Sequence, residues 1–375
     1  MSHPKKPIPV WADVLLIPLI NIALAFLVSG MIIYLIGENP FAAMEVLVRG
    51  AFGDSEVIGY TLYYATNFIF TGLAVAVAFH AMLFNIGGEG QAYIGGLGVA
   101  LVLLAFDTVL PFWVLLPLAM GAAIVFGAAW AAIPAYLQAY RGSHIVITTI
   151  MFNFIASNLM VYLLVNVFIV PGSMSPESRV FDASAWLPSL HDLLAKIGIH
   201  IESSPLNLSF LIALAAGVFV WLFVWHTRWG YALRTVGFSA PAAEYAGISS
   251  KKIIMMAMLI SGALAGMAGI NEVMGVQHKL LLDFVAGYGF TGIAVALMGR
   301  NHPAGIVLSS ILFGALYQGG AELAFDMPNI SREMVTMIQG LIILFSGALT
   351  YMSRPWLEQL FGLFSRQKPA QEWRA

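Results

Sequence analysis

The polar side chains best placed for chemistry are Asn85, Glu89 and Gln91, in the segment FNIGGEGQ at 84–91 between two apolar runs. Three glycines interrupt the same segment, and a stable lipid-facing helix does not continue through them. A break at membrane depth is tolerated only where the backbone is buried in protein or lines a cavity. We therefore expect these three side chains to line a translocation pathway. The alternative, that Glu89 caps a helix N-terminus, stays open.

A second set of polar residues is spaced for one face of a helix. Thr149, Asn153 and Ser157 recur every four residues, and an adjacent stripe contains Asn158, Tyr162 and Asn166. In lipid such a face must turn toward other helices or water. Amides and hydroxyls suit a neutral, hydrogen-bonding solute such as a sugar or nucleoside, so the pattern predicts pathway residues at Thr149, Asn153 and Ser157. Hydrogen bonds between helices, worth about 0.6 kcal/mol each, are the alternative.

The segment SGALAGMAG at 261–269 indicates close helix packing. Its small residues recur four apart, which lets helix backbones approach each other. We assign packing roles to Gly262, Gly266 and Gly269. Glu272 follows this segment, and we interpret it as a surface residue near the outer interface rather than a pathway residue.

A weak internal repeat is indicated by a second glycine-rich segment. Glycines precede a short apolar run at 282–299, as they do at 84–105. Repeats of this kind place the substrate route at their interface. His80 and His302 lie at expected helix ends without a second ligand at metal spacing, so no metal site is expected.

The sequence lacks the motifs of an enzyme. It has no G-x-x-x-x-G-K-[ST] phosphate loop, and no cysteine. No Ser/His/Asp arrangement or paired-carboxylate site is recognisable either. We expect no catalytic residue and no bound cofactor, and if transport uses ATP, hydrolysis must take place on a separate polypeptide.

Composition places the chain in a membrane. Of its 375 residues, 60% are hydrophobic and only 10% are charged, whereas soluble domains are about 25% charged. A net charge of −2 argues against nucleic acid as a partner. We predict an all-α polytopic membrane protein in which residues 1–375 form a single transmembrane domain in the lipid bilayer.

About ten transmembrane helices are expected, because a span needs about 20 apolar residues. Two of them are short enough to be half-helices or re-entrant segments, namely 92–105 and 286–298. The candidates are 12–36, 60–84, 92–105, 111–133, 144–170, 208–227, 253–275, 286–298, 303–321 and 333–352.

The distribution of basic residues sets the orientation. With both termini cytoplasmic, twelve of the 17 lysines and arginines fall on the inner side. This arrangement makes 228–252 a cytoplasmic loop. It makes the proline-rich segment 171–207 an external loop, which is either a docking surface for a solute receptor or an inert linker.

A short helix is expected inside 228–252, and the two ends of this helix are marked by their residue types. Ser239 is a good N-cap, and Pro241 suits the first turn. Gly247 is the expected stop. About two turns of helix are not stable alone, so this helix needs a docking surface. We assign it as the coupling contact with an ATPase, carried by Ser239, Ala242, Ala243, Glu244, Tyr245, Gly247 and Ile248.

Several of these stretches together resemble the ABC importer permeases for sugars, nucleosides and branched-chain amino acids. The similarity runs from about 60 to 350. It rests on FNIGGEGQ, the 237–248 loop, SGALAGMAG and GYGFTGIAVALMGRNHPAG, and it is nearest to the nucleoside branch. The resemblance implies a fold similar to the vitamin B12 importer permease, with about ten helices and a coupling helix at 237–248. A departure from the family pattern puts Asn67 near the presumed route, so Asn67 joins the candidate pathway residues.

The same resemblance implies the partners and the location. They are an ABC ATPase subunit, an extracytoplasmic solute-binding protein and a second permease subunit, either related or identical, in a bacterial inner (plasma) membrane. Nucleosides are the expected solute, with simple sugars or branched-chain amino acids as alternatives. An ion-coupled secondary transporter with Glu89 or Glu272 as coupling acid, and a non-transporting scaffold, are the rival classes.

Overall fold

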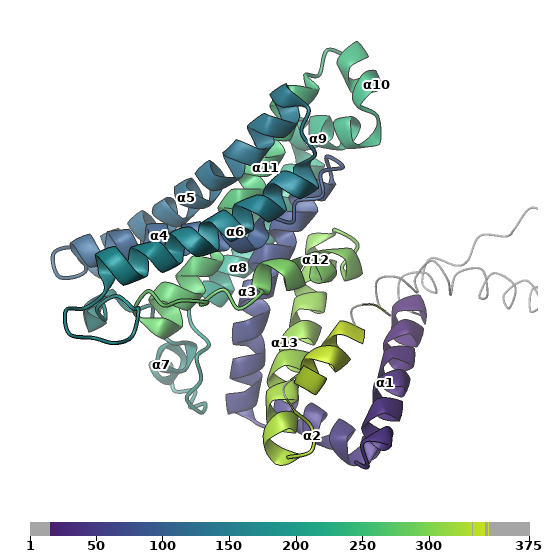
Figure 1. Cartoon of the computed structure of the whole chain (residues 1–375), viewed down its shortest axis with the longest axis vertical. Helices are drawn as coiled ribbons and strands as arrows, with labels where there is room; N and C mark the ends of the chain where they lie inside the picture. The colour runs from purple at the N-terminus through teal and green to yellow at the C-terminus, as the bar shows by residue number, and fades with distance from the viewer. Residues whose placement is uncertain (1–15, 332, 342–343, 345–375) are drawn as a thin grey trace, which may run out of the picture. The chain divides into compact units, whose positions relative to one another are not determined.

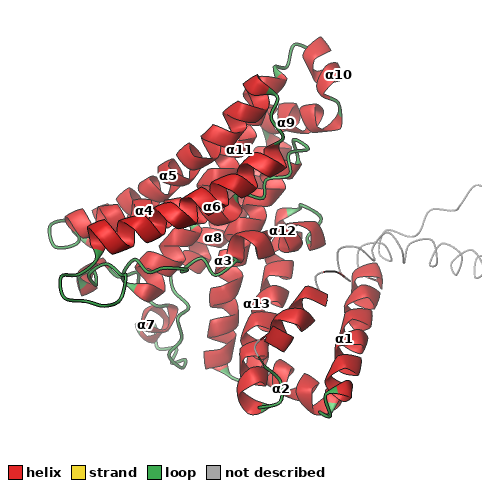
Figure 2. Cartoon of the chain, viewed as in Figure 1, coloured by secondary structure: helices red, strands yellow, loops and turns green. Residues whose placement is uncertain are grey.

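A computed structural model describes residues 16–331, 333–341 and 344, and it is helical throughout (Figures 1 and 2). No β-strand occurs among these residues. The α-helices are α1 Ile17–Leu35, α2 Pro40–Phe52, α3 Ser55–Phe79, α4 Gly88–Phe106, α5 Phe112–Arg141, α6 Ile145–Leu163, α7 Leu190–Ala195, α8 Ser209–His226, α9 Arg228–Phe238, α10 Ala240–Tyr245, α11 Ser250–Gly266, α12 Tyr288–Met298 and α13 Pro303–Asp326. There are also two π-helices, η2 Leu164–Phe168 and η4 Ile270–Gln277, and a 3-10 turn, η3 Ala183–Ala185. Residues 333–341 are helical as well.

The chain divides into two compact units. The larger contains residues 46–322 and every candidate site residue named above. The smaller combines residues 1–45 with 323–375, and its described part includes α1 and the hydrogen bond from Asn329 Nδ2 to Glu38 Oε1. Everything below concerns the larger unit.

The prediction of a polytopic all-α membrane protein is confirmed. Within the described residues, seven helices are long and apolar enough to span a membrane, and Tyr288–Met298 and Ala23–Leu35 are shorter apolar helices. They correspond to nine of the ten predicted spans. The tenth, 333–352, lies largely outside the described residues.

The prediction that 92–105 is a short span was wrong. Helix α4 begins at Gly88 and extends for 19 residues, which is long enough to cross the bilayer. Its first turn is polar and glycine-rich, so hydropathy alone ends the apolar run too early. Because this turn is buried against protein rather than lipid, the helix continues through it.

Glycines let α4, α5 and α11 pack with their backbones in contact. A Cβ at Gly262 would overlap the carbonyl oxygen of Gly127 on α5, and one at Gly266 would overlap that of Ala123. A Cβ at Gly269, just beyond α11, would lie 2.7 Å from the backbone nitrogen of Gly96 on α4. These close approaches hold the three helices as one rigid bundle.

The two loops assigned to opposite sides of the membrane lie at opposite ends of the long helices. Figure 1 shows α10 beyond one end of α5 and α6, and α7 beyond the other. The contacts agree with this view. Tyr140, at the end of α5, lies under the ammonium group of Lys251 beside α10, whereas Asp107, just before α5, pairs with Arg179 of the 171–207 segment.

Candidate functional site

Two broken helices begin side by side at the glycine-rich segments. The carboxylate of Glu89, in the first turn of α4, accepts hydrogen bonds from the backbone N–H groups of Gly287 (2.9 Å) and Gly289 (2.8 Å). These are free donors at the start of α12. A Cβ at Gly289 would overlap the backbone nitrogen of Glu89, so only glycine permits this approach. Glu89 therefore caps the partner helix across almost 200 residues of sequence.

The other polar residues of the 84–91 segment are bonded to one another. Asn85 Nδ2 donates to Gln91 Oε1 (3.0 Å) and to Ser261 Oγ (2.9 Å), and Asn85 Oδ1 accepts from Gly87 N. From α6, Asn153 Oδ1 accepts from Gly90 N (2.9 Å), and Asn153 Nδ2 donates to the carbonyl of Ile86. The hydrogen bonds of Asn85, Gln91 and Asn153 thus fix the backbone conformation of the 84–91 segment.

The predicted polar stripe of α6 divides between two environments. Thr149 is buried and donates to the carbonyl of Ile145 in its own helix, and Ser157 is half-buried. The adjacent stripe of Asn158, Tyr162 and Asn166 is exposed on the surface of this chain. Both asparagines donate to carbonyls four residues back. An amide and phenol stripe within a span, turned away from its own chain, marks a wet path or a contact with another subunit.

The interpretation of Glu272 as a surface residue was wrong. Its side chain is buried in η4, and its Oε1 accepts from Tyr63 Oη and Asn67 Nδ2, both at 2.6 Å. Asn271 extends the network, since its Nδ2 donates to Asn67 Oδ1 and its Oδ1 accepts from Asn207 Nδ2. The network joins α3, η4 and the segment before α8.

Sequence reasoning missed Tyr63 and Asn207 in this network. They lie about 140 residues apart, and no local pattern connects them. A buried carboxylic acid flanked by two amides in an otherwise apolar bundle requires such partners. The only available signal was the presence of Glu272 and Asn271 next to a membrane span.

The short helix predicted within 228–252 is confirmed as α10. Ser239 Oγ accepts from Ala242 N, and Gly247 has a φ of +80°. The N–H of Gly247 bonds to the carbonyl of Glu244, and that of Ile248 bonds to the carbonyl of Ala243, which is the Schellman ending expected of a glycine stop.

The α10 helix divides into an inner and an outer face. Ala243 is fully buried against its own chain, so it cannot provide close approach to a partner. Ala242, Glu244 and Gly247 are exposed, and Ile248 is half-buried. Tyr245 is 98% exposed. Just before α10, Phe238 is 96% exposed, and sequence reasoning missed it.

The 228–252 segment packs on the ends of other helices. A Cβ at Gly237 would overlap the carbonyl of His80, which ends α3. Burial lowers the pKa of His80, and its Nε2 lies 3.1 Å from the carbonyl oxygen of Asn301. That carbonyl can only accept, so Nε2 carries the hydrogen. A displacement of α10 and the preceding Gly237 would therefore also move the end of α3 and the turn between α12 and α13.

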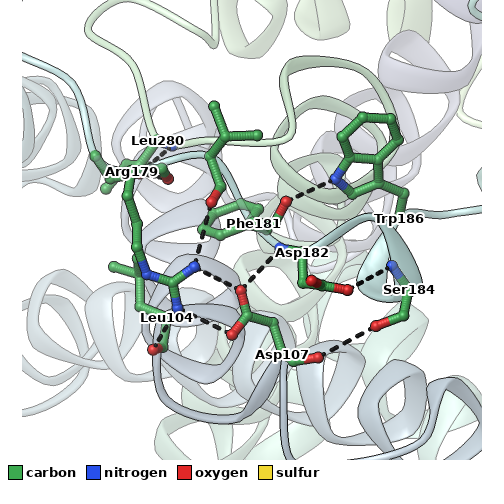
Figure 3. Close-up of polar contacts among 10 residues, drawn as sticks. Leu104, Asp107, Arg179, Phe181, Asp182, Ser184, Trp186 and Leu280 are labelled. Atoms are coloured by element: carbon green, nitrogen blue, oxygen red, sulfur yellow. Dashed lines mark hydrogen bonds and ion pairs between the residues drawn. The ribbon is translucent and has the colours of Figure 1, made fainter.

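A partly buried ion pair fixes the 171–207 segment to the end of α4 (Figure 3). Arg179 donates to both oxygens of Asp107, at 2.6 and 2.9 Å, and to the carbonyl of Leu104. The hydrogen bond from Arg179 lowers the pKa of Asp107, with a further contribution from the N–H of Asp182. Asp107 is buried and Arg179 is not, so the pair is a clamp on the end of the span.

Comparisons with known proteins agree with this architecture. The family described as branched-chain amino acid transport system / permease component matches residues 57–347. A guanosine ABC transporter permease protein of Bacillus subtilis is 37% identical over 88% of this chain and 92% of its own length. A nucleoside ABC transporter permease protein of Lactococcus lactis is 34% identical (88% and 90%), and a glucose ABC transporter permease protein of Haloferax volcanii is 35% identical (91% and 89%).

Proposed function

This chain belongs to the permease family of branched-chain amino acid transport systems, and we propose that it carries nucleosides across the plasma membrane as part of an ATP-driven importer. The observation that carries the choice of solute is that two relatives, at 37% and 34% identity, are a guanosine permease and a nucleoside permease. The chain is a transport subunit and not an enzyme. ATP is hydrolysed on another subunit.

The charges of the described core suit a neutral solute. The N-terminus of α12 would attract an anionic group, but Glu89 already neutralises it. The face that α6 turns outward offers amides and a phenol, at Asn158, Asn166 and Tyr162, rather than cations. A phosphorylated solute would find no matching charge along this face.

A simple sugar is the second candidate, because one relative at 35% identity is a glucose permease. The hydroxyl-rich, uncharged chemistry of a sugar would also suit the α6 face. Ion coupling through Glu89 is not favoured, since both carboxylate oxygens hold backbone N–H groups.

The ATPase is expected to bind α10 on the cytoplasmic side. Phe238 and Tyr245 project from this segment almost fully exposed, while Ala243 anchors it to the permease. Exposed aromatic side chains of this kind are the usual anchors of a protein interface. Ser239 and Gly247 shape the ends of the helix rather than contact the partner.

A second permease subunit is expected against the outward stripe of α6. Asn158, Tyr162 and Asn166 lie within a membrane span, where lipid would not satisfy their polar groups. The solute pathway would then run between two chains, and an external receptor would deliver the solute to the side that carries 171–207.

The experiment is uptake of tritiated guanosine by cells with and without this chain, with unlabelled adenosine, glucose and leucine as competitors. Uptake that depends on the chain and on ATP, and that only nucleosides inhibit, supports the proposal. Absence of chain-dependent guanosine uptake together with chain-dependent uptake of labelled glucose would select the sugar. Uptake that follows the proton gradient without ATP would refute the importer.

A further inference from the structure

A cavity of 490 Å³ lies at the external end of the larger unit. Its volume is within the range of sites that hold small molecules. The 171–207 segment supplies most of its wall, and α3 and the end of η4 supply the rest. Among its lining residues are Tyr60, Trp186, His191, Ser204, Asn207 and His278.

The wall of this cavity is held in place by backbone hydrogen bonds. The N–H of Phe181 bonds to the carbonyl of His278 (2.8 Å), and that of Leu187 bonds to the carbonyl of Met274 (3.2 Å). Trp186 Nε1 donates to the carbonyl of Phe181, as Figure 3 shows. The external segment is therefore not an inert linker, and the cavity is formed before any ligand arrives.

The aromatic part of the wall is a stacked pair. The rings of Trp186 and His278 lie 3.9 Å apart and 8° from parallel. His278 Nδ1 lies 3.2 Å from the carbonyl oxygen of Met274, which can only accept, so Nδ1 carries hydrogen. Burial lowers the pKa of His278, which keeps the imidazole neutral and leaves Nε2 as an acceptor. Trp186 as a whole remains 39% exposed.

Two polar atoms of the wall have no hydrogen-bond partner among the residues that the structure describes. One is Ser204 Oγ, whose residue is only 7% exposed and is pressed against Gly59 of α3. The other is His191 Nδ1. Neither atom is accessible in the structure, so a ligand reaches it only when its side chain turns toward the cavity. An unpaired buried polar group costs about 1–3 kcal/mol, and a ligand that supplies a partner favours this turn.

The charge of the cavity wall excludes phosphorylated ligands. The lining residues include Asp192 but no lysine or arginine from the described part of the chain. A phosphate group would meet a carboxylate without a compensating cation. A neutral molecule with hydroxyl groups and a flat heterocycle fits both the free polar atoms and the indole.

We propose that this cavity is a nucleoside-binding site within the permease itself, in which the base lies on the exposed part of Trp186 and Ser204 hydrogen-bonds a polar group of the solute. The identity of the ligand rests on the proposed function. The site would hold a nucleoside on the external side, separately from the path along α6. It would bind without the external receptor.

The test is equilibrium binding of tritiated guanosine to the complete transporter in nanodiscs, without the receptor. Ser204→Ala should weaken binding about 3- to 10-fold, the equivalent of one hydrogen bond. Ser203→Phe, which fills the cavity from an exposed wall position, should abolish it. The matched controls are Ser184→Ala on the same segment and Trp113→Ala on α5, and both should bind normally. Guanosine 5′-monophosphate should not compete.

Two measurements separate this site from the proposed function. Two results would overturn the site and leave the function intact, provided that receptor-dependent guanosine uptake is normal. One is that guanosine does not bind without the receptor, and the other is that both cavity variants leave its binding unchanged. Absence of nucleoside uptake by the wild-type transporter would refute the function and the ligand together. Photolabelling by 8-azidoadenosine should mark 183–207 or 275–278. If the receptor crosslinks to position 186 and added nucleoside does not reduce the crosslink, the cavity is a docking site for the receptor. That result would overturn the proposal.

Discussion

Replacing Glu89 should destabilise the bundle far more than an ordinary acidic residue at a helix start. In Glu89→Ala the backbone N–H groups of Gly287 and Gly289 lose the carboxylate that accepts their hydrogen bonds in a buried setting. Each charged hydrogen bond is worth about 1.5–3 kcal/mol, so the expected loss is about 3–6 kcal/mol. Glu89→Gln keeps one oxygen but places an NH₂ group against a donor, and should lose about half as much.

The assay is SDS-induced unfolding of the purified chain in mixed micelles. Glu56→Ala is the matched control, because Glu56 is an exposed acidic residue in the first turn of α3. Its interaction with the helix dipole should be worth no more than about 1 kcal/mol. Equal, small losses for Glu89→Ala and Glu56→Ala would refute the bridging role. If uptake depends on a proton gradient in the wild type and not in Glu89→Gln, the result would support an ion-coupled secondary transporter.

Three further outcomes are expected. Phe238→Ala and Tyr245→Ala should fold normally, because both side chains are exposed, yet reduce uptake at least 10-fold and weaken capture of the ATPase in a pull-down. The lowered pKa of Asp107 means that its native form binds fewer protons than the unfolded chain. Its stabilisation should therefore be complete above about pH 3.8 and be lost as the pH falls through the lowered value, and Arg179→Ala should reduce this dependence. Gly266→Leu should cost more than about 3 kcal/mol, because α5 leaves no room for a side chain.

Features encoded locally could be predicted from the sequence. The N-cap Ser239 and the stop at Gly247 are determined by neighbouring residues, and the predicted helix matches α10 within a residue at each end. Apolar runs of membrane length likewise predicted the spans, because each must bury its own backbone bonds.

Features that depend on distant partners could not be predicted. Nothing near Glu89 in the sequence indicates that its carboxylate meets Gly287 and Gly289. Nothing near Glu272 separates a buried acid from one at the membrane surface, since the difference lies in Tyr63 and Asn67 on another helix. The exposure of Phe238 depends on which side of α10 packs on the chain, which periodicity over two turns does not resolve.

Helix α4 connects the ion pair of Asp107 and Arg179 to the paired starts of α4 and α12. Asp107 follows its last residue and Glu89 lies in its first turn, so the two carboxylates are separated by about 27 Å of continuous helix. Glycine contacts with α11 and the following turn keep the helix from bending. If the receptor docks on 171–207, any load on Arg179 is passed through Asp107 along α4. It then reaches the N-terminus of α12 through Glu89, because that carboxylate is bonded to α12 and not only to its own helix. A variant that removes either the Asp107–Arg179 pair or the hydrogen bonds of Glu89 to α12 should still bind nucleoside. Its uptake should no longer respond to the receptor.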